Sequence, residues 1–223
     1  MTKIKTIVNL IKPCKCVYDI GSDHAYLSIL LLQEKKVKLV VNIDKNKKPL
    51  LNGINNLKKE NLLTKTLNIQ SDGFNQIIDT NLSIPDYVVM SGIGGLNMIK
   101  ILELMPKEFI TSKFILVPNS NEYLLRKWVN DNNYSIFNEK IIYEKKKFYH
   151  LIEFQKNKIF ENLSELELHF GPINLSKNKL ELKEFLCAKK GTLEKNKSLN
   201  KSIVQKKYYS YINQALERLD ENN

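Results

Sequence analysis

The sequence predicts an α/β fold in which a mostly parallel sheet is covered by helices and followed by a helical C-terminal segment. Strand-like and helix-like segments alternate from Cys16 onward, which is typical of a parallel sheet with helices on its faces. With 223 residues, 43% of them apolar, the chain can bury one medium-sized core. Beyond about residue 155 the strand pattern ends and apolar residues follow helical spacing.

Short apolar runs predict five parallel strands, at residues 16–20, 38–43, 65–70, 87–91 and 114–117. Helices are predicted between them at residues 25–33, 47–60, 96–105 and 122–130. In the second of these helices Leu50, Ile54 and Leu57 have helical spacing, and Pro106 helps to end the third. Residues 135–143 and 148–154 flank the lysine turn 145–147 and predict an antiparallel pair at one edge of the sheet.

The composition becomes polar around residues 155–159, and we place a domain boundary there. Residues 1–155 are expected to form the sheet domain and residues 156–223 a helical domain. Apolar residues three and four positions apart predict an antiparallel, coiled-coil-like helical hairpin in the second domain. These residues are Leu180, Leu182, Phe185, Leu186 and Leu193, then Val204, Tyr208, Tyr211, Ala215 and Leu219.

The net charge of +11 favours a polyanionic partner such as a nucleic acid. Lysine supplies 33 of the 35 basic residues and asparagine occurs 26 times, so A·T-rich codon usage accounts for part of this charge. The longest apolar runs, such as residues 27–32, are far shorter than the roughly 20 residues that cross a bilayer. Residues 1–16 lack the pattern of a signal peptide, and we therefore expect a cytoplasmic protein without a membrane contact.

Three cysteines, Cys14, Cys16 and Cys187, are too few and too far apart for a four-ligand zinc site or a disulfide framework, and we expect no metal. The most informative segment is V-Y-D-I-G-S-D-H-A-Y-L at residues 17–27, a strand that enters a glycine turn and then a helix. Such a turn lets a ligand approach free amides at the helix terminus. A dinucleotide site needs G-x-G-x-x-G, but only Gly21 is present and Asp23 would lie beside the phosphates. A nicotinamide-dependent oxidoreductase is therefore disfavoured, whereas a ligand with cationic groups, such as S-adenosylmethionine, suits an acidic turn.

Acidic residues follow the predicted strand ends. Asp44 follows the second strand, where a carboxylate can accept hydrogen bonds from both ribose hydroxyls of a nucleotide cofactor. After the third strand, Asp72 could meet an adenine amine and Phe74 could stack on its ring. Each carboxylate alone also fits a helix cap or a solvated turn. Together with Asp23 after the first strand, however, they make three carboxylates at one sheet edge, which favours a cofactor cleft. Glycines at 92, 94 and 95 either open the floor of this cleft to a flat substrate or form a turn.

Taken together, the motifs resemble the bacterial tRNA (adenine-22 N1)-methyltransferase family. They are D-I-G-S-D-H-A-Y-L at 19–27, Asp44-Lys45 with Pro49-Leu50, S-G-I-G-G at 91–95, Leu116-Val117-Pro118-Asn119, Phe148-Tyr149 and Phe170-Gly171-Pro172. The resemblance implies a Rossmann-like class I methyltransferase sheet and S-adenosylmethionine-dependent methylation of adenine N1 in tRNA. Ser28, Ile93 and Val117 stand where proline, methionine and glutamine are usual in the family.

The resemblance also implies site residues. Those expected to bind the cofactor are Asp19, Gly21, Ser22, Asp23, His24, Asp44, Lys45, Asp72, Gly73, Phe74 and Gly92. Catalytic positioning roles are expected for His24, Ile93 and Asn119. Adenine N1 carries a free lone pair at neutral pH, so orientation of the base can replace a general base. His24 therefore fits a cofactor contact better than proton transfer.

A non-catalytic RNA-binding module on the same fold is the alternative interpretation, although every acid on the cofactor side is present. We expect the chain to act as a monomer. Lysines on the outer faces of the helical hairpin are expected to contact tRNA, with a solvated helix face as the competing explanation. They are Lys183, Lys189, Lys190, Lys195, Lys197, Lys201, Lys206 and Lys207.

Overall fold

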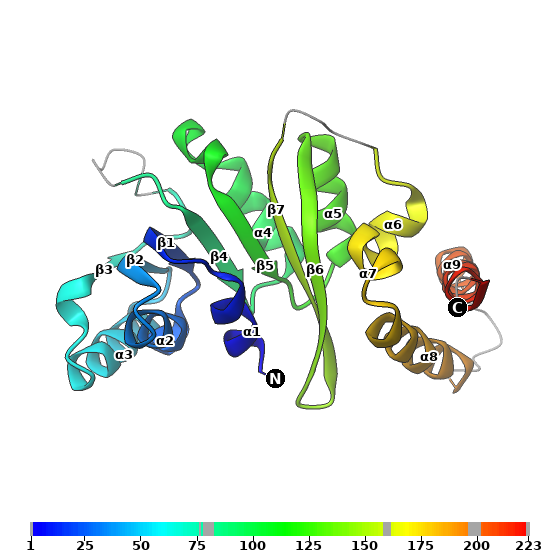
Figure 1. Cartoon of the computed structure of the whole chain (residues 1–223), viewed down its shortest axis with the longest axis horizontal. Helices are drawn as coiled ribbons and strands as arrows, with labels where there is room; N and C mark the ends of the chain where they lie inside the picture. The colour runs from blue at the N-terminus through cyan, green and yellow to red at the C-terminus, as the bar shows by residue number, and fades with distance from the viewer. Residues whose placement is uncertain (1, 76, 78–82, 158–161, 196–201, 222–223) are drawn as a thin grey trace.

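The structure is a computed structural model and describes residues 2–75, 77, 83–157, 162–195 and 202–221. Seven strands form one mixed sheet in the order β3-β2-β1-β4-β5-β7-β6 (Figure 1). The five parallel strands are β1 (Cys14–Ile20), β2 (Val37–Asp44), β3 (Thr66–Gln70), β4 (Tyr87–Ser91) and β5 (Lys113–Val117). The antiparallel pair β6 (Tyr134–Glu144) and β7 (Lys147–Lys156) forms the edge beside β5. The predicted fold class and hairpin edge are confirmed.

Four helices follow the predicted positions in the sheet region: α2 (Tyr26–Gln33), α3 (Lys47–Lys59), α4 (Gly95–Glu103) and α5 (Glu122–Asp131). A helix that the sequence analysis did not predict, α1 (Lys3–Leu10), precedes the sheet, with Thr2 accepting the amide of Lys5 as its N-cap. Helices α1 and α2 pack on one face of the sheet, and α4 and α5 pack on the other. No helix in the described ranges is long and apolar enough to cross a membrane.

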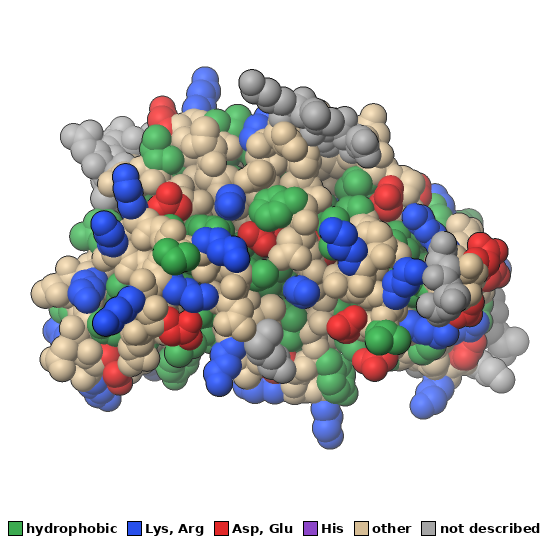
Figure 2. All heavy atoms as spheres, in the orientation of Figure 1, with side chains coloured by type: hydrophobic (Ala, Val, Ile, Leu, Met, Phe, Trp, Pro, Cys, Tyr) green, Lys and Arg blue, Asp and Glu red, His purple; other side chains and the backbone are tan. Residues whose placement is uncertain are grey.

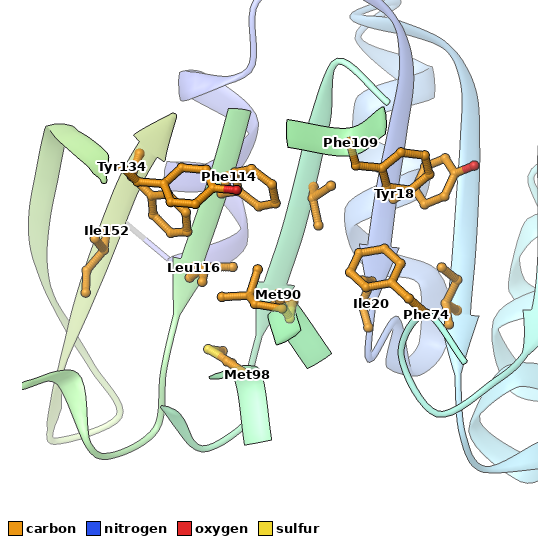
Figure 3. Packing of buried hydrophobic residues seen from close by; sticks show 14 of the residues in the cluster. Tyr18, Ile20, Phe74, Met90, Met98, Phe109, Phe114, Leu116, Tyr134 and Ile152 are labelled. Atoms are coloured by element: carbon orange, nitrogen blue, oxygen red, sulfur yellow. The ribbon is translucent and has the colours of Figure 1, made fainter. Parts of the chain in front are cut away.

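The core lies on both faces of the sheet because side chains alternate along each strand. On the face that carries α4 and α5, Tyr18 meets Phe109 edge to face at 5.3 Å between ring centroids, and Phe114 stacks on Phe154 at 5.0 Å. Met90 and Met98 belong to the same cluster and lie below these two aromatic groups as drawn in Figure 3. Continuous burial of both faces explains why the parallel strands read as short apolar runs.

The C-terminal region contains α6 (Glu165–Phe170), α7 (Pro172–Ser176), α8 (Lys179–Lys195) and α9 (Ile203–Glu221). Helices α8 and α9 run antiparallel, as predicted: Lys183 Nζ lies 2.7 Å from Asp220 Oδ1, and Tyr209 donates to Glu194 Oε1 at 2.7 Å. Their apolar stripes bury only in part, since Leu180 is 78% and Val204 76% exposed. Lys197 and Lys201 lie outside the described residues.

Two short helices, α6 and α7, were not predicted from the sequence. Ser164 and Glu167 form a capping box at the start of α6, so an S-x-x-E pattern was available as a signal. Helix α6 packs on α5, and helix α7 packs on β6 and α8 (Figure 1), and Phe170 and Leu175 share a buried cluster with Ile141 of β6. The division of the chain at residues 155 and 156 stays a prediction.

A buried ion pair joins the helical region to the sheet. The Arg126 guanidinium on α5 donates from Nε to Glu139 Oε1 on β6 at 2.8 Å, and both side chains are 0% exposed. Arg126 Nη1 also donates to the carbonyls of Leu168 and His169 at the end of α6. Arg126 Nη2 lies 3.1 Å from His150 Nδ1 on β7, whose pKa is lowered well below its ordinary value by burial and by the Arg126 charge. The His150 ring therefore stays neutral and accepts this hydrogen bond.

The other carboxylate oxygen of Glu139 accepts the amides of Ile173 and Asn174 at the start of α7. A helix N-terminus favours a negative charge at this position. Gly171, with φ of 95°, precedes α7, and a Cβ there would overlap the Glu139 carboxylate. Glycine is therefore required for the close approach of α7 to the sheet.

We predict that Arg126→Met lowers the free energy of unfolding by about 3 to 5 kcal/mol, because it leaves the Glu139 carboxylate buried without its cation. The chain's other arginine, Arg218, is exposed on α9, so Arg218→Met serves as the matched control and should cost under about 1 kcal/mol. Urea unfolding of both variants measures the difference. Equal effects of the two substitutions would contradict the structural role of the pair.

Candidate functional site

A hollow of about 670 Å³ opens at the carboxyl ends of the parallel strands. In the strand order β1 lies between β2 and β4. The chain continues from β1 to β2 and β3 on one side, and then crosses to β4 on the other side of β1. Ligands of open α/β sheets bind in the crevice outside such a switch point. The volume is within the range of small-molecule and cofactor sites. This hollow is called the cofactor pocket below.

The first glycine turn borders this pocket. Gly21 follows β1 with φ of 77°, and the amides of Gly21 and Ser22 both donate to the carbonyl of Ile43 at the end of β2. A Cβ on Gly21 would lie 2.8 Å from Ile93 Cδ1, so the turn and the loop after β4 are in close contact. Gly92, by contrast, has φ of 84° and no atom within 4 Å of such a Cβ. Of the three glycines after β4, Gly92 is the one that leaves open space.

His24 and Ala25 directly after the turn both have left-handed backbone conformations, with φ of 60° and 56°. Non-glycine residues rarely adopt this conformation, and such strain is concentrated at functional sites. Helix α3 holds it in place, since Asn56 donates to the carbonyl of His24 at 3.1 Å and Gly53 leaves room for Ala25. The His24 ring stacks on Tyr26 and its Nε2 lies 3.3 Å from Asp23 Oδ1.

Two buried carboxyl groups lie at the ends of β1 and β2. Asp44 is 7% exposed, and its Oδ1 accepts the amide of Asn46 at 2.8 Å, which fixes the carboxylate at the pocket wall. Asp19 is 6% exposed. Burial, and secondly the negative charge of Asp44, raise the pKa of Asp19 to about 7. Both effects disfavour the charged form of Asp19, and a cation placed beside it would act in the opposite direction and favour the carboxylate.

Most of the predicted cofactor residues line the pocket. These are Gly21, Asp23, Asp44, Lys45, Asp72, Gly73 and Gly92, together with Ile93 from the predicted positioning group. Asp19, Ser22 and His24 lie in or next to the first turn but are not among the lining residues. Phe74 is 0% exposed and packs against Phe109 at 5.7 Å between centroids, so its ring belongs to the core and does not face the pocket. The expected stacking role of Phe74 is therefore not supported by its position.

Helix α4 and its C-cap residue supply pocket residues that sequence reasoning missed. Asn97, Lys100 and Ile101 of α4 and Leu104 at its C-cap line the pocket, and Asn97 is three or four positions from Lys100 and Ile101. Helical spacing was the available signal, but the same pattern also fits a helix that only covers a core. Among the described residues, no group of three or more His, Cys, Asp or Glu side chains is arranged to hold a metal ion.

Asn119 follows β5 and contacts the loop after β4 that borders the pocket. The side-chain amide of Asn119 donates to the carbonyl of Gly92 at 2.6 Å, and its backbone amide donates to the carbonyl of Ile93 at 2.9 Å. Two hydrogen bonds therefore fix the loop that holds the open glycine. Asn119 was predicted as a positioning residue, and in the structure it contacts the backbone of that loop.

We predict that Asp19→Asn raises the free energy of unfolding at pH 8 by up to about 4 kcal/mol, since one pKa unit corresponds to about 1.4 kcal/mol. The pKa of Asp19 is raised by folding from 3.8 to about 7, so its ionisation costs stability as the pH rises through this window. The gain should be small near pH 4 and complete above pH 7. Urea unfolding across this range, with Asp131→Asn as an exposed control, measures it. A gain that does not change with pH would contradict this account of Asp19.

Residues 17–223 match the family described as TrmK, tRNA (adenine(22)-N(1))-methyltransferase. A Mycoplasma genitalium protein with the provisional name tRNA methyltransferase MG248 is 33% identical over 190 residues, which cover 83% of this chain and 84% of the relative. The tRNA (adenine(22)-N(1))-methyltransferase of Bacillus subtilis is 28% identical over 152 residues, or 67% of this chain and 62% of the relative.

A solved structure of M. capricolum TrmK in complex with S-adenosylhomocysteine superimposes with a TM-score of 0.83 at 30% identity. The superposition covers 100% of this chain and 96% of that one, so it includes the C-terminal helices as well as the sheet. The sequence motifs and the sheet topology agree with these matches, and the chain belongs to the tRNA (adenine(22)-N(1))-methyltransferase family.

Proposed function

We propose that the cofactor pocket is where this chain performs its family's reaction, the S-adenosylmethionine-dependent methylation of N1 of adenine 22 in tRNA. The observation that carries this assignment is the pair of buried carboxyl groups, Asp19 and Asp44, beside a single glycine turn. This arrangement suits a cofactor that carries an ammonium, a sulfonium and a ribose. It is unsuited to a pyrophosphate, which needs a glycine-rich turn free of acids.

The proposed cofactor contacts follow the strand order. Asp19, Gly21, Ser22, Asp23 and His24 hold the methionine end, where a cationic group would favour the carboxylate form of Asp19 against the effects that raise its pKa. Asp44 and the adjoining Lys45 hold the ribose, because the Asn46 amide fixes one Asp44 oxygen and so orients the carboxylate at the pocket wall. Asp72 is exposed at the turn that Ser71 stabilises by donating to the carbonyl of Gly73, and it receives the adenine amine.

Bound S-adenosylmethionine supplies an electrophilic methyl group. The chain's own task is then to orient the adenine, because N1 has a free lone pair and needs no base. Gly92 leaves space for the flat base, and Asn119 holds the Gly92 and Ile93 carbonyls in place. Ile93, Ile101 and Leu104 contribute apolar side chains to the pocket lining. An adenine paired within the folded tRNA must first be released, as in other enzymes that extract a base.

Residues 1–155 are proposed to bind the cofactor and residues 156–223 to contribute RNA contacts. The chain is proposed to act as a monomer. A tRNA substrate also fits a cytoplasmic location. Of the lysines expected on the outer faces of the helical hairpin, Lys189, Lys195, Lys206 and Lys207 are exposed, Lys190 is half-buried and Lys183 pairs with Asp220.

We predict that Asp44→Ala weakens S-adenosylmethionine binding by about 1.5 to 3 kcal/mol, the scale of a hydrogen bond to a charged group. Calorimetric titration of the cofactor measures the loss, and circular dichroism checks that the fold is retained. Asp131→Ala, which removes an exposed carboxylate from the end of α5, should leave the affinity unchanged. Unchanged affinity of a folded Asp44→Ala protein would remove Asp44 from the site, and tight binding of a nicotinamide cofactor by the wild type would overturn the assignment.

The direct test of the reaction uses unmodified tRNA with adenine at position 22 and radiolabelled S-adenosylmethionine. We expect label in the tRNA and a reverse-transcription stop caused by the N1 methyl group at that position. The same tRNA with guanine at position 22 should receive no label. Absence of transfer to the first tRNA, with cofactor binding intact, would favour the non-catalytic RNA-binding module.

A further inference from the structure

A second hollow, of about 730 Å³, lies between the β6–β7 hairpin, the start of α5 and the two long C-terminal helices. It is called the hairpin groove below. Aromatic side chains from α5, β6, β7, α8 and α9 border it, including Tyr123, Tyr143, Phe148, Phe185 and Tyr208. The lysines that border it are Lys146, Lys147 and Lys189, against one acidic side chain, Glu122, among the described lining residues. Aromatic rings interleaved with lysines are typical of single-stranded nucleic-acid binding surfaces.

Charge alone does not single out this groove. Figure 2 shows lysine and arginine side chains spread over the whole visible face rather than gathered in one patch. The distinguishing feature is an exposed aromatic side chain beside the charges. Tyr143 is 60% exposed, and its ring lies 4.7 Å from that of Phe148. Phe148 in turn packs edge to face on Phe185 of α8, so the exposed ring rests on a fixed support.

Strand pairing places the hairpin at the edge of the sheet that carries the cofactor pocket. Antiparallel β7 pairs with β5 from Phe114 opposite Phe154 to Leu116 opposite Ile152, whereas β6 and β7 stay paired as far as Glu144 opposite Lys147. The hairpin therefore extends several residues past the carboxyl end of β5, which is visible as the protruding loop in Figure 1. At about 3.4 Å per residue, this extension is on the order of 13 Å.

The loop after β4 separates the two hollows. Asn119 borders the hairpin groove, and it donates hydrogen bonds to the carbonyls of Gly92 and Ile93, which border the cofactor pocket. A strand of RNA in the groove would therefore lie next to the loop that carries Gly92.

The turn of the β6–β7 hairpin has lysine at two positions where the backbone conformation disfavours it. Lys145 and Lys146 have φ of 49° and 62°, the conformation of a two-residue turn that favours asparagine and glycine. Asparagine occurs 26 times in this chain, yet both positions are lysine. Local rules are most often broken where function requires the residue.

We propose that the hairpin groove holds the tRNA strand beside the target adenine, with Tyr143 stacking on an unstacked base and Lys146 contacting a phosphate. This inference rests on the proposed function, since it takes tRNA as the substrate. It adds the surface on which the RNA lies and the two side chains that bind it.

The test measures binding of unmodified tRNA by the full-length protein over a range of salt concentrations. Tyr143→Ala should raise the tRNA dissociation constant about 10-fold, within the range for loss of one base–aromatic stack. The tRNA affinity of Tyr143→Ala should depend on salt as steeply as that of the wild type, because stacking releases no counterions. Lys146→Ala should weaken binding and reduce the slope of log affinity against log salt by about 1, as expected for one lost phosphate contact.

Three controls make the result specific. Tyr143→Phe keeps the ring and should bind as the wild type does, and Lys59→Ala removes an exposed lysine from α3 at the opposite edge of the sheet. Cofactor affinity should be the same in all variants. Wild-type tRNA affinity in both Tyr143→Ala and Lys146→Ala would overturn the groove proposal, while methylation by the wild type would still support the proposed function. A wild type that binds no tRNA would overturn both.

Discussion

The buried pair of Arg126 and Glu139 is the interaction on which the arrangement of this molecule depends. Two charges removed from water are tolerated only when their remaining hydrogen-bonding groups are satisfied. Here the end of α6 supplies carbonyls to Arg126 and the start of α7 supplies amides to Glu139. The C-terminal helices are therefore attached to the sheet through polar groups with a fixed geometry, in addition to a shared apolar cluster.

This attachment determines which surfaces face each other. Because α6 and α7 are held against α5 and β6, the following helix α8 lies beside the β6–β7 hairpin and Phe185 reaches Phe148. The sheet contributes a second constraint, since parallel strands bring all their carboxyl ends to one edge. The hairpin extends past that same edge. The cofactor pocket and the hairpin groove thus lie on either side of the loop that Asn119 holds.

The sequence was sufficient for the sheet and for most of the pocket, because a strand end followed by glycine and acids is a local pattern. It was insufficient where the role of a residue depends on distant partners. Arg126 has the pattern of a surface residue on an amphipathic helix, and only the packing of α6 reveals that it is buried. Phe74 follows a pocket acid, yet its ring turns into the core against Phe109. The short helices α6 and α7 lack the length that makes helical periodicity visible.

Hydrogen exchange of the full-length protein, with S-adenosylhomocysteine and with tRNA added separately, tests most directly whether two adjacent sites share the loop after β4. The cofactor product should protect amides in residues 19–24, 44–46 and 71–75, at the ends of β1, β2 and β3. Bound tRNA should protect residues 119–123 and 143–150. Residues 91–95 should respond to both ligands. Protection of residues 143–150 by the cofactor product, or none at residues 19–24, would contradict this account.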